Sequence, residues 1–119
     1  ALKLPLYQKA VEELGLKGPS LAYLVSHDAV ALTTLSKDRL TVRYALYRRP
    51  YRKRPLRSKL LISLANSTVI NKHPRYSAIY HHYYEKLTGR HRHWKAVLRV
   101  ALRILRDLHG LVQKAGPPA

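Results

Sequence analysis

The chain has 119 residues, which suffices for one domain with a modest hydrophobic core. Its 23 Lys and Arg residues against 6 Asp and Glu residues give a formal charge of +17, so the free protein would repel itself, which indicates a polyanionic partner. The absence of cysteine excludes disulfides, thiolate metal sites and cysteine nucleophiles. No apolar run approaches the roughly 20 residues of a membrane span, and nothing at the N-terminus resembles a signal peptide, so we expect a soluble protein.

The N-terminal part is predicted to be mainly helical, with one alternative left open. Residues 1–18 begin extended and then place apolar side chains on one helical face, before glycines that can end a helix. Residues 20–35 also fit a helix, with Ser20 as its N-cap, although several Val and Thr residues favour a strand. The pattern of residues 38–49 does not distinguish a helix from a strand. A short β hairpin within 20–47 is therefore the alternative.

The most basic segment is 37–59, in which ten of 23 residues are Lys or Arg and tyrosines and prolines are interspersed. Unpaired charges at this density cannot be buried, so the segment must face water or a polyanion. Guanidinium groups suit phosphate because they offer a planar fork of donors. We therefore predict an extended basic arm or helix-turn-helix that wraps nucleic acid, rather than a solvated linker or localisation signal. Its candidate contact residues are Lys37, Arg39, Arg43, Arg48, Arg49, Arg52, Lys53, Arg54, Arg57 and Lys59.

Three helices are predicted in the C-terminal half, at about 57–70, 74–88 and 91–114. The second begins at Pro74, a favourable residue in a first helical turn, and Gly89 can cap its end. It carries a stripe of tyrosines at helical spacing, which we interpret as core or subunit interface rather than as a base-stacking platform. The stripe consists of Tyr76, Ile79, Tyr80, Tyr83 and Leu87.

The last of these helices has the clearest two-sided pattern. Its predicted apolar face consists of Trp94, Val97, Leu98, Ala101, Leu102, Leu105, Leu108 and Leu111. Cations recur at spacings of three and four residues on the other side, with Asp107 as the one acid among them. Solvated faces usually mix charges of both signs, so this ridge predicts a second line of phosphate contacts. Its proposed contact residues are Arg92, Lys95, Arg99 and Arg103, and Arg106 continues the ridge.

No catalytic site, metal site or cofactor is predicted. Ser26, His27 and Asp28 carry the side chains of a hydrolase triad, but three consecutive residues cannot form that relay. Of the seven histidines, His91 and His93 could chelate a metal, but no carboxylate other than Glu85 is near, and zinc sites usually need three or four ligands. The chain also lacks a P-loop, a GxGxxG and an HExxH motif. We expect no enzymatic activity.

The opening LPLYQKAVEELGLKGPSLAYLVSHDAVALTTL resembles the last motif of CRISPR-associated RecB-type nucleases. In that motif a Gln, followed four residues later by a Tyr, begins a helix that leads into a hydrophobic strand. Tyr7 matches the Tyr, whereas Lys3 stands at the Gln position and the upstream Asp and Glu-x-Lys have no counterpart. The resemblance implies a truncated nuclease that has lost its activity.

In size, basicity and helical C-terminal half, the chain resembles the nucleocapsid proteins of the filamentous tristromavirus group, whose hosts are hyperthermophilic archaea. The scarcity of Asn and Gln, and the absence of Met, fit a hot environment. The resemblance implies paired helical subunits that wrap double-stranded DNA and hold it in A-form. The implied partners are double-stranded DNA and other coat subunits in a helical polymer, located in a virion that is assembled in the host cytoplasm.

A second resemblance covers residues 71–114, which are similar to the C-terminal part of RNA-guided insertion-sequence transposases, without the Gly-rich, Ser-bearing segment expected before it. We predict a mainly α, single-domain protein (1–119) that packages double-stranded DNA through sequence-independent phosphate contacts. The alternatives are an RNA-binding ribosomal-type protein and a transposase fragment.

Overall fold

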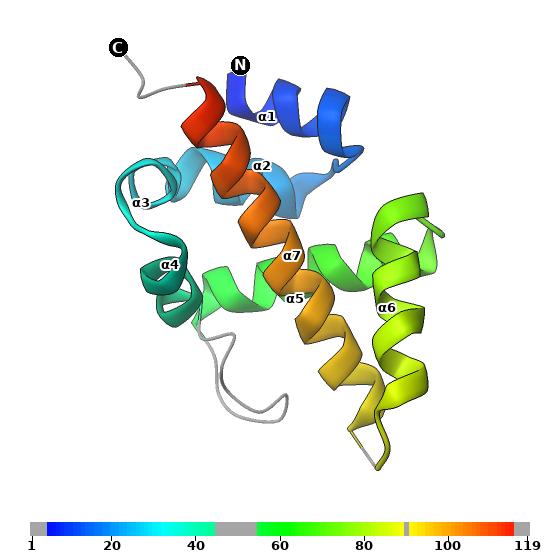
Figure 1. The fold of residues 1–119 in the computed structure, drawn as a ribbon. Helices are drawn as coiled ribbons and strands as arrows, with labels where there is room; N and C mark the ends of the chain where they lie inside the picture. The colour runs from blue at the N-terminus through cyan, green and yellow to red at the C-terminus, as the bar shows by residue number, and fades with distance from the viewer. Residues whose placement is uncertain (1–4, 45–54, 90, 116–119) are drawn as a thin grey trace.

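The computed structural model describes residues 5–44, 55–89 and 91–115, and the mainly α prediction is confirmed for them (Figure 1). These ranges contain no strand. The elements in chain order are α1 (Pro5–Lys9), the π-helix η1 (Ala10–Leu14), α2 (Pro19–His27), α3 (Ala29–Thr34), α4 (Lys37–Arg43), α5 (Leu56–Ile70), α6 (Pro74–Lys86) and α7 (Arg92–Ala115).

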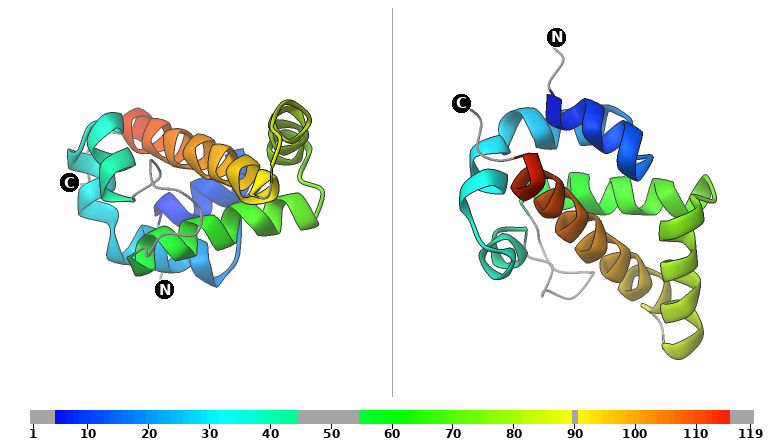
Figure 2. Two further views of the ribbon diagram at one scale, coloured as in Figure 1. Left: turned by 90° about the horizontal axis from the view of Figure 1, so that it is seen from below. Right: turned by 45° about the horizontal axis from the view of Figure 1, so that its top comes forward.

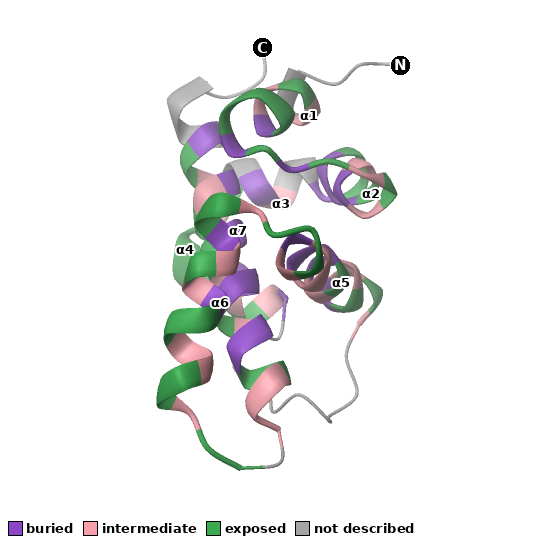
Figure 3. Ribbon diagram, turned by 90° about the vertical axis from the view of Figure 1, so that its right-hand side faces the viewer, coloured by how far each residue is buried: buried purple, intermediate pink, exposed green. Residues whose placement is uncertain are grey.

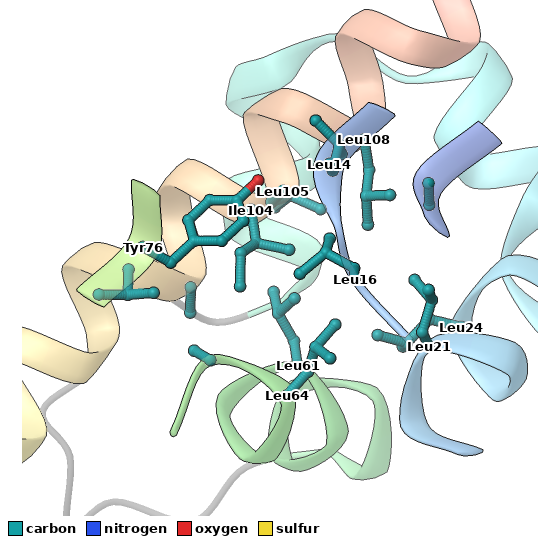
Figure 4. Close-up of a cluster of buried hydrophobic side chains, with 14 of the residues drawn as sticks. Leu14, Leu16, Leu21, Leu24, Leu61, Leu64, Tyr76, Ile104, Leu105 and Leu108 are labelled. Atoms are coloured by element: carbon teal, nitrogen blue, oxygen red, sulfur yellow. The ribbon is translucent and has the colours of Figure 1, made fainter. Parts of the chain in front are cut away.

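The other helices are arranged around α7, the longest element. Helix α5 crosses α7 near its middle, and α6 runs beside the N-terminal turns of α7 (Figures 1 and 2). Helices α3 and α4 and the N-terminal elements contact α7 nearer its C-terminal end. Leucines from the end of η1 and the linker after it, from α2 and from α5 share one buried core with Ile104 and Leu108 of α7 (Figure 4). Burial of these apolar side chains supplies the main driving force for this arrangement.

The buried face of α7 is rotated from the predicted one. Five of the predicted residues are buried, and they are joined by Ala96, Val100 and Ile104. Trp94 is 43% exposed, so its assignment to the apolar core face was wrong. Helix α6 lies beside the first turns of α7 (Figures 1 and 3). Leu98 and Leu102 are half-buried.

The N-terminal hairpin of helices is fixed by Gly15 and His73. Gly15 ends η1 with φ of +70°, a left-handed conformation that suits glycine. The last residue of η1 contacts His73, whose Nε2 lies 2.7 Å from the Leu14 carbonyl oxygen. The Nδ1 of His73 accepts hydrogen bonds from the backbone N–H groups of Arg75 and Tyr76, so this side chain is the N-cap of α6. A neutral imidazole with the proton on Nε2 satisfies all three contacts.

Residues 20–44 form the helices α2, α3 and α4 with short turns between them and contain no strand, so the β hairpin allowed within 20–47 is wrong for this described part of the range. Helix α2 starts at Pro19, with Gly18 rather than Ser20 as its N-cap residue. The β-branched residues are overridden because Leu21, Leu24 and their neighbours at helical spacing are buried against the core.

The segment 37–59 was predicted to be an extended arm or a helix-turn-helix, and its described parts are helical, so the extended form is wrong for them. Its start forms α4, whose N-cap Ser36 accepts a hydrogen bond from the Arg39 N–H at 3.2 Å. Its end forms the first turn of α5. The intervening residues 45–54 lie outside the described residues. The helix-turn-helix form stays a prediction.

The three C-terminal helices are confirmed to within two residues at each end. Gly89, with φ of +101°, lies in the turn before α7, and Leu87 rather than Gly89 follows the last residue of α6. In the tyrosine stripe, Tyr76 and Tyr80 are buried, as expected for core residues, and Tyr83 is half-buried.

Candidate nucleic-acid interface

The outer face of α7 carries a row of cations. Lys95, Arg99, Arg103 and Arg106 are exposed, and Arg92 is half-buried. The spacings of three and four residues place them on one side, opposite the buried residues of the same helix. At about 1.5 Å of rise per residue, the row is about 21 Å long. We refer to these five residues as the α7 ridge.

Arg92, at the start of the α7 ridge, is held against α6. Its guanidinium carbon lies 3.9 Å from the centre of the Tyr84 ring, and its Nε donates a 2.6 Å hydrogen bond to the Tyr84 carbonyl oxygen. This combination of a cation–π contact and a hydrogen bond fixes the α6–α7 turn. Arg92 is therefore less available to an external anion than the four exposed cations.

Asp107 compensates part of the charge of the α7 ridge. It accepts a hydrogen bond from the Tyr76 hydroxyl at 2.6 Å and contacts Arg75 and Arg103 at 3.3 Å each. Burial of the Tyr76 ring, and then the hydrogen bond to Asp107, raise the pKa of the Tyr76 phenol. Within the described residues, Arg99 and Arg106 have no carboxylate partner.

A groove lies between α6 and α7, alongside the ridge. Its volume is about 420 Å³, and it is open to solvent on one side. The half-buried side chains Ile79, Tyr83 and Leu102 form its apolar part, and exposed groups surround them. The full lining consists of Ala78, Ile79, His82, Tyr83, Arg99, Leu102, Arg103 and Arg106. We call this the α6–α7 groove.

Arg43, which the sequence suggested as a phosphate contact, is bound within the protein. Its Nη2 lies 2.5 Å from Asp28 Oδ1, and its Nε lies 3.0 and 3.1 Å from the two carboxylate oxygens. The Tyr44 hydroxyl donates a further 2.5 Å hydrogen bond to the same carboxylate, which is buried. The hydrogen bond to Asp28 raises the pKa of Arg43, and burial, followed by the bond to Asp28, raises the pKa of Tyr44.

Arg57 also has an internal role. Its Nε donates a 3.0 Å hydrogen bond to the Arg43 carbonyl oxygen, which ties the first turn of α5 to the end of α4. Lys37 and Arg39 on α4 and Lys59 on α5 are exposed. The five remaining candidates lie outside the described residues, and they are Arg48, Arg49, Arg52, Lys53 and Arg54.

Sequence reasoning missed the two aspartates that hold arginines in the fold and the α6–α7 groove. Asp28 is 15 residues from Arg43, so no local pattern joins them. Arg106 was visible as part of the ridge but was not chosen as a contact. The half-buried position of Tyr83 beside Arg99 results from the packing of α6 against α7. The periodicity of either helix alone does not predict that packing.

Among the described residues, no group of three or more His, Asp or Glu side chains is arranged to hold a metal ion. None of the described helices is long and apolar enough to cross a membrane. No protein-family model, no curated protein and no solved structure matches the chain significantly. The fold and the site define a helical protein with a cationic face on its longest helix.

Proposed function

We propose that the protein is a non-enzymatic structural subunit that packages double-stranded DNA through sequence-independent phosphate contacts. The observation that carries the proposal is the α7 ridge, where Lys95, Arg99 and Arg106 have no carboxylate partner within the described residues. A row of uncompensated cations on a rigid helix is stabilised when it meets a row of phosphates.

The overall charge supports coating rather than a small recognition site. With 23 cations and 6 acids, one-to-one pairing of every acid would still leave 23 − 6 = 17 cations. Duplex DNA carries one negative charge per about 1.7 Å of axis, so 17 cations balance about eight to nine base pairs. A protein of this size that neutralises so much DNA contacts backbone rather than base edges.

A second line of contacts is assigned to the segment 37–59. Lys37, Arg39 and Lys59 are exposed and suited to phosphate. Arg43 and Arg57 are instead assigned to hold the ends of α4 and α5 together. The composition of 45–54 supports a role in binding for its five cations, which are Arg48, Arg49, Arg52, Lys53 and Arg54.

The sequence resemblance to tristromavirus nucleocapsid proteins supports a more specific proposal. The protein is then a coat subunit in the virion, assembled in the host cytoplasm, with double-stranded DNA and further coat subunits as partners. The DNA is held in A-form within a helical filament. A ribosomal-type protein would instead bind one copy per folded RNA, and a transposase fragment would need catalytic groups.

Electron microscopy of the purified protein with random-sequence linear duplex DNA, and separately with structured RNA, tests this proposal. We expect uniform filaments whose length follows the length of the DNA, and circular dichroism of the complex then reports A-form or B-form. Saturation at one copy on RNA, with no filament on DNA, would overturn the nucleocapsid proposal.

Salt-dependent binding to random duplexes tests the phosphate contacts directly. Replacing Lys95 by Gln is expected to flatten the slope of log K against log salt concentration by about 0.9. The triple change of Arg52, Lys53 and Arg54 to Ala should lower affinity for every sequence alike. Lys17→Gln, which removes an exposed cation outside these segments, is the control. A loss that depends on DNA sequence would contradict backbone binding.

A further inference from the structure

The composition of the α6–α7 groove is not explained by contacts with duplex phosphates alone. One part is cationic and the other is apolar and aromatic. We propose that this groove binds one nucleoside phosphate unit, with the phosphate on the α7 arginines and the sugar and base against Ile79, Tyr83 and Leu102. This goes beyond the proposed function, because the bases of a coated duplex are paired and stacked and cannot enter a groove.

The cationic part is arranged for one phosphate group. Arg103 lies about one helical turn from Arg99 on one side and from Arg106 on the other. The contact between Arg103 and Asp107 holds the Arg103 side chain in place, whereas its two neighbours have no carboxylate partner within the described residues. A phosphate above Arg103 is within reach of both neighbouring guanidinium groups, each of which can donate charge-assisted hydrogen bonds.

The apolar part would add nothing to the binding of inorganic phosphate. Ile79, Tyr83 and Leu102 are half-buried and line a volume of about 420 Å³, which lies within the range of small-molecule sites, roughly 300–1,000 Å³. A ligand that fills it must carry a planar or apolar body next to its charge. A nucleoside phosphate has both parts, joined by a sugar.

Tyr83 is the ring on which a base can stack. Its face is covered loosely, with the Arg99 guanidinium carbon 5.3 Å from the ring centre, near the outer limit of a cation–π contact. The corresponding distance of Arg92 over Tyr84 is 3.9 Å, and Arg92 is also hydrogen-bonded to the backbone there. Arg99 lacks such an anchor, so it can turn to the phosphate and uncover the Tyr83 ring.

An acidic segment from a second copy of the chain fits the groove less well. The chain has six acids in total, and Asp28 and Asp107 are already bound to arginines within the fold. The ligand chemistry therefore points to nucleotides, which have two sources. One is a free nucleotide, and the other is an unpaired nucleotide in a single strand or at a strand end.

Calorimetric titration of the full chain at fixed ionic strength tests the ligand class, with adenosine monophosphate, ribose 5-phosphate and inorganic phosphate as probes. We expect the nucleotide to bind about tenfold more tightly than ribose 5-phosphate, because stacking of one base contributes about 1–3 kcal/mol. Equal affinity for the three probes would overturn the proposal and leave only a general attraction of anions to the α7 ridge.

Three single variants locate the site. Ala78→Leu places extra volume in the groove from an exposed helical position, without a change in charge, and it is expected to lower nucleotide affinity at least about tenfold. Arg106→Gln should lower it by a similar factor, since a hydrogen bond to a charged group contributes about 1.5–3 kcal/mol. Lys17→Gln is the matched control, because it also removes one exposed cation but lies outside both the α7 ridge and the groove. Thermal unfolding of each variant verifies that the fold is retained.

The variants also separate this proposal from duplex coating. If Ala78→Leu leaves nucleotide affinity unchanged in a folded protein, the groove proposal is overturned, whereas filament formation on duplex DNA is unaffected by that result. Repeating the titration with a single-stranded oligothymidylate identifies the source. If Ala78→Leu lowers the affinity for the mononucleotide alone, the groove binds free nucleotides. If it lowers the affinity for both probes, the groove also binds unpaired nucleotides of a strand.

Discussion

Replacing Arg43 by Gln, and separately Arg39 by Gln, distinguishes an arginine that holds the fold together from one that we propose to bind DNA. Arg43 and Arg39 lie four residues apart on α4, and both belong to the basic segment. Arg43 is bound to Asp28, whereas Arg39 is exposed. We therefore expect Arg43→Gln to reduce stability and leave the salt dependence of DNA binding unchanged, and Arg39→Gln to do the opposite.

The magnitude follows from the surroundings of Asp28. Its side chain is 6% exposed, so the loss of Arg43 leaves a buried carboxylate that still accepts the hydrogen bond from the Tyr44 hydroxyl. Breaking a fully buried pair in this way costs about 3–5 kcal/mol. The Arg43 side chain is 37% exposed, so water can reach the pair, and we expect a loss of about 2 kcal/mol. For 119 residues, this lowers Tm by about 8 °C.

Two assays on each variant decide the question. Thermal unfolding without DNA gives the change in Tm, and binding to a random duplex at several salt concentrations gives the slope of log K. We expect the slope to fall by about 0.9 for Arg39→Gln and to stay constant for Arg43→Gln. An Arg43→Gln protein with unchanged Tm and a reduced slope would refute the assignment of this arginine to the fold.

Four further predictions concern stability. Burial raises the pKa of Tyr44 and Tyr76 in the folded protein, so the full stability is present below the unfolded value of about 10 and is lost at higher pH, by about 1.4 kcal/mol per pH unit for each tyrosine. Urea unfolding between about pH 10 and 12 measures this slope, and Tyr76→Phe should reduce it. Gly15→Ala should cost about 2 kcal/mol or more in thermal unfolding, because φ is +70° and the new Cβ would lie 2.9 Å from the His73 Nε2. Gly110→Ala, in open space on α7, should instead stabilise the protein by about 0.5–1 kcal/mol. Raising the salt concentration should raise Tm, because screening weakens the mutual repulsion of a chain with charge +17; a lower Tm in salt would contradict this.

The C-terminal helices were predictable because their signals are local. Pro74 marks the start of α6, and the apolar residues of α7 recur at helical spacing over many turns. The N-terminal helices were harder to predict, since Val and Thr residues favour strands and helical spacing is equally satisfied there. The burial of Leu21 and Leu24 in the core favours the helix over the strand. This packing cannot be predicted from a single sequence.

The candidate site was predictable as a surface but not in its details. The spacing on α7 correctly places Lys95, Arg99 and Arg103 on one exposed side. Some cations are paired inside the fold with a carboxylate that is far away in the sequence, as Arg43 is with Asp28. A local sequence pattern does not predict such pairs. Trp94 shows the same limit, because its exposure depends on where α5 crosses α7 rather than on the periodicity of α7.

Asp28 and Asp107 are bound in the same way, each by an arginine and the tyrosine that follows it in sequence. The dipeptide Arg-Tyr occurs at two places in the chain, and each time both side chains contact a single aspartate. Arg43 and Tyr44 contact Asp28, and the corresponding pair on α6 contacts Asp107. In each case the aspartate links helices distant in sequence, while the tyrosine hydroxyl donates to the carboxylate alongside the arginine. Among the exposed cations of the described residues, these two aspartates pair with Arg75 and Arg103, and they do not pair with Lys95, Arg99 or Arg106. The proposed DNA partner would supply the negative charge that these uncompensated cations favour.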